Sequence, residues 1–282
     1  MRWFDEESRA VQTIRAPLVF LCASALESTR ILLLSRPSNS PAGLGGDSGA
    51  LGRYLMDHTY VKLEGQSPAL VAPAGDLDMG RCVFLPRFDA RHRPGGRPEG
   101  RGFGVQVAQF SAGWGGTYFV GSSFGEMLPN EENHVTLDPE RQDAWGIPVL
   151  RIDCRHTQED LARAREQADA LRELADVAGV RSPQLSPVPA EPGASVHECG
   201  TARMGTSPSD SVLDPHNQCW EARGLYVTDG ASFPSQGYQN PTLTIMALTA
   251  RACDHALKTR FGKIFTSKGD SWHPATPDPS PQ

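Results

Sequence analysis

The chain has 282 residues, a formal net charge of −6 and a sequence pI near 5.8. This acidic balance excludes the broad electrostatic attraction that a nucleic-acid-binding protein needs, and no block of lysine and arginine replaces it. The first residues lack the basic start and apolar core of a secretion signal, and no apolar run approaches the roughly 18 residues that would span a bilayer. The sequence therefore predicts a cytoplasmic protein with no membrane span and no nucleic-acid partner.

Six cysteines are scattered along the chain, and no two of them form a C-x-x-C pair. This spacing indicates neither a zinc site nor a disulfide framework. We expect reduced thiols that are mostly buried, and no metal site.

The N-terminal residues predict one unit of a layered α/β sheet. Residues 1–15 read as a short polar hairpin, and the apolar run at 18–22 suits a strand that is buried on both faces. Residues 25–35 carry leucine and isoleucine at helical intervals, and Pro37 stops that pattern. A strand, a tight turn of small residues and a helix together make one βα unit.

A glycine-rich loop follows at residues 43–49. It has neither the G-x-G-x-x-G spacing nor a Lys-Ser/Thr ending, so we favour a flexible connection over a phosphate cradle. A nucleophile elbow at Ser48 is weaker still, because Ala50 replaces the closing glycine and no buried strand precedes it. A hydrolase that uses Ser48 is therefore a distant alternative.

The middle of the chain predicts a mainly antiparallel sheet. Residues 60–120 alternate apolar and polar positions between Pro/Gly segments, and two more strands around a turn follow at 134–153. The Pro/Gly/Arg-rich stretch 89–102 is expected to be a solvated loop between strands.

Residues 157–178 form the clearest predicted helix. Thr157 is the expected N-cap, Glu159 and Asp160 occupy the first turn, and Gly179 follows the end. The apolar stripe of this helix, which we expect to serve packing, comprises Leu161, Ala168, Leu171, Leu174 and Ala178. Beyond the helix we expect a Pro-rich connector and, at the C-terminus, a disordered tail.

A buried strand at 225–228 is predicted to end at Asp229 and Gly230. A carboxylate at a sheet edge, beside a glycine able to take a positive φ, suits the hydroxyls of a ribityl or ribose group. An ordinary turn explains the same pair equally well.

Asn240 and Pro241 predict the start of the last helix, with Asn240 as N-cap and Pro241 as the first helical residue. The N–H groups at such a start attract negative charge, which suits the edge of a reduced flavin. Asn240 can also be a cap and nothing more, and capping does not exclude a catalytic role.

His197 lies in a loop of small residues that would let a substrate approach closely. Its unperturbed pKa of about 6.5 leaves it largely neutral at pH 7, able to accept a hydroxyl proton while the carbon gives up hydride. The other histidines are expected to be structural: His58, His92, His134, His156, His216, His255 and His273.

Three motifs occur in order: H-x-x-G-T-x-R-M-G at 197–205, LYVTDG at 225–230 and NPT at 240–242. This ordered set resembles the closing signature of the glucose-methanol-choline oxidoreductases. Upstream, VFLCASALESTRILLLS and GRYLMDH are similar to segments that follow the flavin-domain hairpin of that family, and LDPERQDAWGIPVLRID is similar to its substrate-domain strands. The resemblance covers residues 1 to about 260.

The resemblance implies FAD-dependent oxidation of a small-molecule alcohol, such as a sugar, polyol or sterol-like CH–OH donor. It implies that His197 is the catalytic base and that Asn240 is the second active-site residue, aligning the substrate oxygen. It also implies a group of residues near the cofactor: Ala23, Ser24, Asp229, Gly230, Asn240, Pro241 and Thr242.

The implied fold is α/β (α+β), with a partial FAD-binding Rossmann-like domain and a mainly antiparallel substrate-domain sheet that has a covering helix. Residues 1–52 are expected to supply part of the FAD domain and 53–194 the substrate domain. Residues 195–260 then return to the FAD domain with the active-site motifs, and 261–282 form the tail.

The glycine fingerprint with which this family grips the FAD pyrophosphate is absent from the chain. Three explanations are open: a truncated gene product, one half of a split enzyme whose FAD-binding N-terminal half is a separate chain, or an inactive remnant that serves as an interaction protein. Intact His197 and Asn240 favour a catalytic role over the remnant.

Overall fold

The computed structural model describes residues 2–36, 42–67, 81–86, 102–112 and 116–261. Most of the loop expected at 89–102 and nearly all of the tail expected at 261–282 lie outside these ranges. Within them, no helix is both long enough and apolar enough to cross a membrane.

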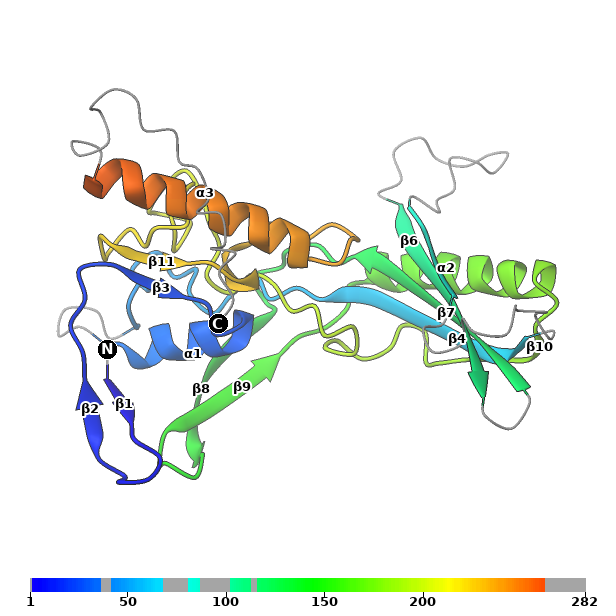
Figure 1. Cartoon of the computed structure of the whole chain (residues 1–282), viewed down its shortest axis with the longest axis horizontal. Coiled ribbons are helices and arrows are strands. Elements are labelled where there is room, and N and C mark those ends of the chain that lie inside the picture. Colours follow the sequence, from blue (N-terminus) through cyan, green and yellow to red (C-terminus); the bar gives the residue numbers. More distant parts are fainter. Residues whose placement is uncertain (1, 37–41, 68–80, 87–101, 113–115, 262–282) are drawn as a thin grey trace, which may run out of the picture.

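One end of the molecule, which we name the antiparallel region, is a five-stranded sheet with strand order β10-β4-β7-β6-β5 (Figure 1). The strands are β4 (His58–Ser67), β5 (Arg81–Leu85), β6 (Phe103–Ala112), β7 (Gly116–Glu126) and β10 (Arg181–Leu185). All neighbouring pairs are antiparallel. The expected antiparallel sheet is confirmed.

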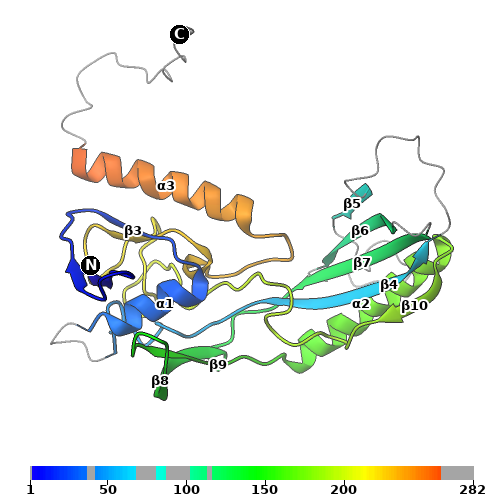
Figure 2. The same cartoon turned by 60° about the horizontal axis from the view of Figure 1, so that its bottom comes forward.

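Helix α2 (Gln158–Val177) covers one face of this sheet (Figure 2). Val61, Leu63 and Val105 point to that side and are 0% exposed. On the opposite face the cross-strand pair Phe110 and Tyr118 is about half exposed, at 48% and 52%. The sheet therefore has a dry face under α2 and an accessible face, as the alternation of side chains along its strands requires.

The expected cap of α2 is confirmed. The Thr157 hydroxyl accepts a hydrogen bond from the Asp160 N–H, and the Asp160 carboxylate accepts one from the Thr157 N–H, which completes a capping box. The expected packing stripe is correct at Ala168 and Leu171 but wrong at Ala178, which is exposed because α2 has ended at Val177.

The expected Pro-rich connector after α2 contains a strand. Residues Arg181–Leu185 form β10, which pairs with β4 and is an edge strand of the sheet. The pairing shifts register between Arg181 and Gln184, around Pro183. Proline has no N–H to donate, so a strand that contains it is tolerated at a sheet edge or an irregularity.

The other end of the molecule, which we name the parallel region, is a three-layer arrangement. Strands β3 (Val19–Leu21) and β11 (Leu225–Val227) are parallel neighbours. Helix α1 (Ala25–Leu34) packs on one face of this pair, and α3 (Thr242–Phe261) packs on the other (Figures 1 and 2). The predicted βα unit at residues 18–35 is confirmed.

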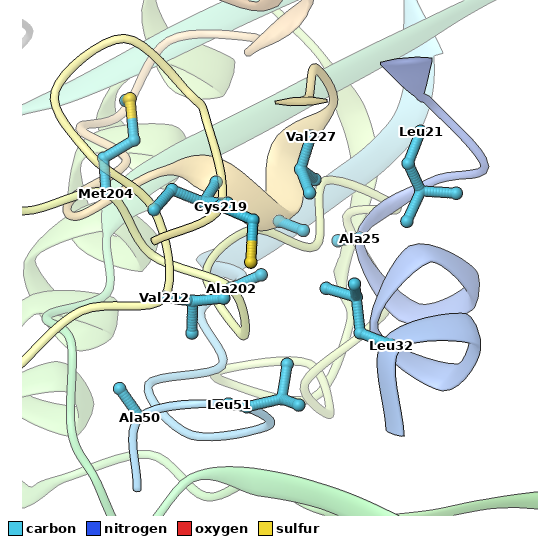
Figure 3. Close-up of a cluster of buried hydrophobic side chains, with 12 residues drawn as sticks. Leu21, Ala25, Leu32, Ala50, Leu51, Ala202, Met204, Val212, Cys219 and Val227 are labelled. Carbon is cyan, nitrogen blue, oxygen red and sulfur yellow. The ribbon is translucent and has the colours of Figure 1, made fainter. Parts of the chain in front are cut away.

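The core of the parallel region joins residues that are far apart in the sequence (Figure 3). Leu21, Leu32 and Leu51 from the first part of the chain pack with Leu213 and Val227 from the last part. All five are at most 8% exposed. The two sequence segments thus bury one common apolar core.

Two hairpins flank α1. The first comprises β1 (Arg2–Phe4) and β2 (Val11–Thr13), as expected for residues 1–15. The second comprises β8 (His134–Gln142) and β9 (Pro148–Asp153). Arg30 of α1 binds the second hairpin through a 2.7 Å ion pair to Asp143 and a 2.8 Å hydrogen bond to the Pro148 carbonyl. Although it falls in residues expected to form the substrate domain, this hairpin packs against the parallel region.

In the glycine-rich loop at 43–49, two N–H groups are bonded to a carboxylate of the chain itself. The N–H groups of Gly45 and Asp47 donate to the two carboxylate oxygens of Glu221, at 2.8 and 2.9 Å. The chain's own carboxylate occupies the position that a phosphate would need, which supports a connecting loop.

All six cysteines are free. The expectation of mostly buried thiols is wrong, because Cys22 and Cys82 are exposed and only Cys199 and Cys219 are buried. Burial raises the pKa of the Cys199 thiol well above its usual range, which keeps that thiol protonated.

Candidate active site

The candidate site lies where the two regions meet, at the start of β4. His197 is half-buried there, and the His58 ring packs edge to face with it, with centroids 5.1 Å apart and planes at 89°. Phe124 of β7 contacts both rings, at 5.7 Å from His197 and 5.6 Å from His58. The imidazole of His197 is therefore held against aromatic neighbours while part of it stays accessible.

Hydrogen bonds hold the loop of His197 in place on both sides of the histidine. Before it, the Asp57 carboxylate accepts from the Ser195 hydroxyl and, at 2.8 Å, from the Gly193 N–H. After it, Met56 and Cys199 exchange two backbone hydrogen bonds of 2.9 Å each. Because the segment that leads into β4 makes all of these bonds, the sheet sets the position of His197.

Gln236 bridges the two histidines. Its Nε2 donates to the backbone carbonyl of His197 at 2.6 Å and lies 3.2 Å from Nε2 of His58. His58 Nδ1 lies 3.3 Å from the Gly125 carbonyl, which can only accept, so this nitrogen carries the proton. The other ring nitrogen of a neutral His58 then accepts from the Gln236 amide.

Both histidines are neutral at pH 7. Burial lowers the pKa of His58 to about 4, assisted by the neighbouring His197 and opposed by the Asp57 charge. Burial also lowers the pKa of His197, against the opposing charges of Asp57 and Glu198. A neutral imidazole can accept a proton, so His197 is in the state that a general base needs.

Two buried polar atoms at this point have no hydrogen-bond partner among the described residues. They are Nδ1 of His197 and Oε1 of Gln236. An unpaired buried polar atom costs about 1 to 3 kcal/mol, and native proteins tolerate it mainly at functional sites. Because Nδ1 of His197 is enclosed, Nε2 is the ring nitrogen left to meet a substrate.

The structure corrects the expected role of Asn240 as a helix cap. The first hydrogen bond of α3 runs from the Ile245 N–H to the Pro241 carbonyl, so Pro241 occupies the cap position and the helix starts at Thr242. The Asn240 side chain instead accepts a 2.8 Å hydrogen bond from the Gln106 amide of β6. With Oδ1 engaged in this way, the N–H groups of the amide are left to donate outward.

The loop that carries Gln236 and Asn240 crosses the end of the sheet. Gln236 of this loop contacts the His197 carbonyl, and Asn240 contacts Gln106. Between them, Tyr238 packs on Gly104, where an added Cβ would lie 3.2 Å from the Tyr238 ring. This path places His197 and Asn240 at the same end of the antiparallel sheet, joined through one short loop.

Asp229 joins the turn at Ala23 and Ser24 to the end of β11. Its buried carboxylate accepts from the Ser28 hydroxyl and from the Ala231 N–H, and the Ser28 oxygen in turn accepts from the Ala23 N–H at 3.0 Å. Burial raises the pKa of this carboxylate, while these hydrogen bonds oppose the rise. The structure thus brings together three expected cofactor residues and shows that their polar groups contact one another.

Gly230 does not use the positive φ that glycine can adopt. An added Cβ there would lie 2.7 Å from the Glu198 carbonyl oxygen and 3.2 Å from the Cys199 sulfur. Glycine is needed at this position because the backbone that follows His197 packs directly on it. Pro241 is buried and Thr242 is exposed at the start of α3.

Sequence reasoning missed His58, Gln236 and Gln106 as site residues, and it assigned His58 a structural role. The sequence does not reveal the contact of His58 with His197, because the two residues are far apart in the chain. A cue existed in GRYLMDH, where a histidine directly precedes an alternating strand and therefore sits at a sheet end.

Comparisons with known proteins agree with the ordered motifs. A family model described as GMC oxidoreductase matches residues 129–249. The 2-methyl-1,2-propanediol dehydrogenase of Mycolicibacterium austroafricanum is 32% identical over 300 aligned positions, covering 94% of this chain and 52% of that protein. A C-glycoside 3-oxidase of Arthrobacter globiformis is 30% identical, covering 95% of this chain and 51% of its own length.

The chain spans about half the length of these curated relatives. Among solved structures, a formate oxidase from Aspergillus oryzae superposes with a TM-score of 0.64 at 18% identity. That match covers 91% of this chain and 57% of the oxidase. At this identity the likeness shows the fold.

Proposed function

Because the chain is the C-terminal part of a glucose-methanol-choline oxidoreductase, we propose that it supplies the proton-handling and substrate side of an FAD site that oxidises alcohols. In this reaction a CH–OH group becomes a carbonyl, the hydroxyl proton goes to a base, and a hydride leaves the carbon. When bound, FAD supplies the acceptor of that hydride.

The observation that carries the proposal is the state of His197. Its ring is neutral and its Nδ1 is enclosed. Hydrogen bonds on both sides of His197 hold its loop in place. Such a ring can take the hydroxyl proton at Nε2 without first losing one. A positioned base of this kind contributes about 10²-fold to 10⁴-fold to a rate.

Asn240 is proposed to align the substrate oxygen. Gln106 holds its amide oxygen, so the amide N–H groups can donate to the oxygen as it becomes a carbonyl. The accessible face of the sheet behind it carries Tyr60, whose hydroxyl lies 3.2 Å from the Ser122 hydroxyl. Hydroxyl and amide groups on an aromatic surface suit a polyol or sugar, which agrees with a diol dehydrogenase and a glycoside oxidase among the relatives.

The described residues fit the flavin end of FAD. His197 and the outward amide of Asn240 lie at one end of the sheet, and Asn240 stands two residues before the N-terminus of α3. Pro241 and Thr242 would border a flavin at that helix start, and the helix dipole would stabilise negative charge on it.

The described residues do not fit the pyrophosphate end. The N–H groups of Gly45 and Asp47 donate to Glu221, and the Ala23 N–H donates to Ser28, whose hydroxyl donates to Asp229. These two loops therefore hold the fold together, and we assign the pyrophosphate grip to a part of the protein outside this chain.

The same conclusion comes from the parallel region. Among the described residues, β3 pairs with β11 on one edge and with no strand on the other. Trp3, Ile14 and Ile31 nearby are 39% to 53% exposed. Parallel sheets are normally wider and covered on both faces, so we propose that an FAD-binding N-terminal half adds to this side, on the same polypeptide or as a separate chain.

The test is His197→Ala in the complex of this chain with that N-terminal half. We expect anaerobic reduction of bound FAD by diol or sugar substrates to slow by about 10²-fold or more, while the bound FAD is retained. His134→Ala is the matched control, because His134 lies on the β8–β9 hairpin and its side chain hydrogen-bonds the neighbouring Glu132 carbonyl. Reduction at an unchanged rate would refute the assignment of His197 as base.

A further inference from the structure

We infer that His58 is a positioning residue for His197, acting as a neutral imidazole that is coupled to it through the Gln236 amide. This inference rests on the proposed function of His197 as a base. It assigns to the first residue of β4 a role that simple packing would not require.

The geometry determines the protonation of His58. Its Nδ1 donates to the Gly125 carbonyl on the neighbouring strand β7, and its Nε2 faces the Gln236 amide nitrogen at 3.2 Å. The ring is 1% exposed, so water does not compete for either nitrogen. A charged His58 would carry a second N–H directed at the Gln236 N–H groups, which would repel it.

The same amide holds the backbone of His197. Gln236 Nε2 donates at 2.6 Å to the His197 carbonyl, so its two N–H groups serve one histidine each. Rotating the amide by 180° would set its oxygen against the His197 carbonyl oxygen. The amide therefore has one allowed orientation, in which Oε1 stays buried and unpartnered.

The ring contact completes the coupling. His58 and His197 pack at 89° with Phe124 against both, so a rotation of the His197 ring would displace the His58 ring or the Phe124 ring. The base is thus fixed by its backbone, through the Gln236 amide, and by its ring, through His58 of β4 and Phe124 of β7.

A neutral His58 also leaves His197 free to become charged. After His197 takes a proton, a second imidazolium 5.1 Å away would oppose it, and the charged groups near the pair, Asp57 and Glu198, would have to offset both. With His58 uncharged, the carboxylates of Asp57 and Glu198 stabilise one cation only.

Three variants separate positioning from packing. His58→Leu keeps an apolar side chain in the buried space but removes the acceptor for Gln236. His58→Gln places a carbonyl oxygen near the position of Nε2 and restores that acceptor. Gln236→Leu leaves His58 in place and removes the bridge, which keeps a test available if His58→Leu does not fold.

Activity is measured in the complex with the N-terminal half. We expect His58→Leu and Gln236→Leu to lower kcat by about 10-fold to 100-fold with little change in KM, since the base is misplaced while the substrate surface is intact. We expect His58→Gln to recover most of the rate. Equal rates for the wild type and all three variants, or equal losses for His58→Leu and His58→Gln, would overturn the inference.

A second readout does not depend on activity. In the full chain labelled with ¹⁵N-histidine, we expect the pKa of His197 to rise toward that of a solvated histidine in His58→Leu and in Gln236→Leu, but to stay low in His58→Gln. If no alcohol is oxidised by the wild-type complex, the proposed function fails while this titration still decides whether His58 positions His197. A His197 pKa that is the same in all variants would contradict the coupling.

Discussion

In the antiparallel region, Val61 and Leu63 are fully enclosed between the sheet and α2. In the parallel region, the sheet has two strands among the described residues, and Trp3 and Ile14 beside it are 45% and 53% exposed. The face of the antiparallel sheet under α2 is thus buried within the chain, whereas the two-stranded parallel sheet leaves apolar side chains exposed beside it. His197 lies at the junction and is held by residues at the start of β4.

This contrast explains how a chain of about half the length of its curated relatives can still hold the proposed base in one position. The residues that fix His197, Asp57 and His58 among them, come from the start of β4 and the sheet behind it. The groups that we propose to bind the FAD pyrophosphate lie outside this chain and would adjoin the parallel region. We therefore propose that this chain holds the substrate side of the FAD site in an ordered arrangement.

The largest expected effect compares a buried leucine of the antiparallel region with an exposed leucine of the parallel region. Leu171→Ala under the antiparallel sheet should lower the free energy of unfolding by about 3 to 4 kcal/mol, because Leu171 is 0% exposed. The matched change Leu34→Ala on α1, where the side chain is 37% exposed, should cost less than about 1 kcal/mol in this chain by itself. Chemical denaturation measures both.

The same two substitutions test whether the N-terminal half covers the exposed side of the parallel region. Once the N-terminal half is bound, Leu34→Ala should become more costly, whereas the cost of Leu171→Ala should not change. Equal costs for both substitutions in the isolated chain would remove the contrast between the two regions.

The second largest effect is a loss of stability in acid, caused by His58 at the junction of the two regions. The pKa of His58 is about 4 in the folded chain and about 6.5 when unfolded, so the unfolded chain binds more protons between these values. The stability that neutral His58 contributes is complete above about pH 6.5 and is lost as the pH falls to about 4, amounting to about 3 kcal/mol.

Unfolding free energies measured from pH 7 to pH 4 give this slope directly. His58→Gln removes the titrating group and should flatten the curve over that range. A variant curve as steep as that of the wild type would assign the acid sensitivity to other residues.

A smaller effect is expected at the start of α2. Thr157→Ala removes the side chain that accepts from the Asp160 N–H, which should lower stability by about 1 kcal/mol. Thr157→Ser keeps the hydroxyl and should be nearly neutral. Thermal unfolding of the two variants measures the difference, and an equal loss in both would show that the capping box contributes nothing.

The elements that local chemistry determines could be predicted from the sequence. Thr157 and its acidic first turn locate α2, and the apolar run before Ala25 locates the strand and helix of the βα unit. Alternation predicts the antiparallel strands. Boundaries that depend on a distant partner could not be predicted, as for β10, which is a strand because the edge of β4 is there to pair with it.

The candidate site divides in the same way. His197 and Asn240 could be chosen from the sequence because their motifs are compact. The neighbours that define their state could not, since Gln106 reaches Asn240 and His58 reaches His197 only through the folded sheet. The expected cap at Asn240 failed for this reason, because a contact with β6 competes with the local preference for capping.

The central claim is that this chain completes an FAD site whose nucleotide grip lies elsewhere. The direct measurement is the visible absorbance of the purified complex formed when the chain is expressed with an N-terminal half that carries the glycine fingerprint. We predict a folded yellow complex that loses its flavin absorbance when an alcohol substrate is added without oxygen. A folded but colourless complex that oxidises no alcohol would contradict the claim.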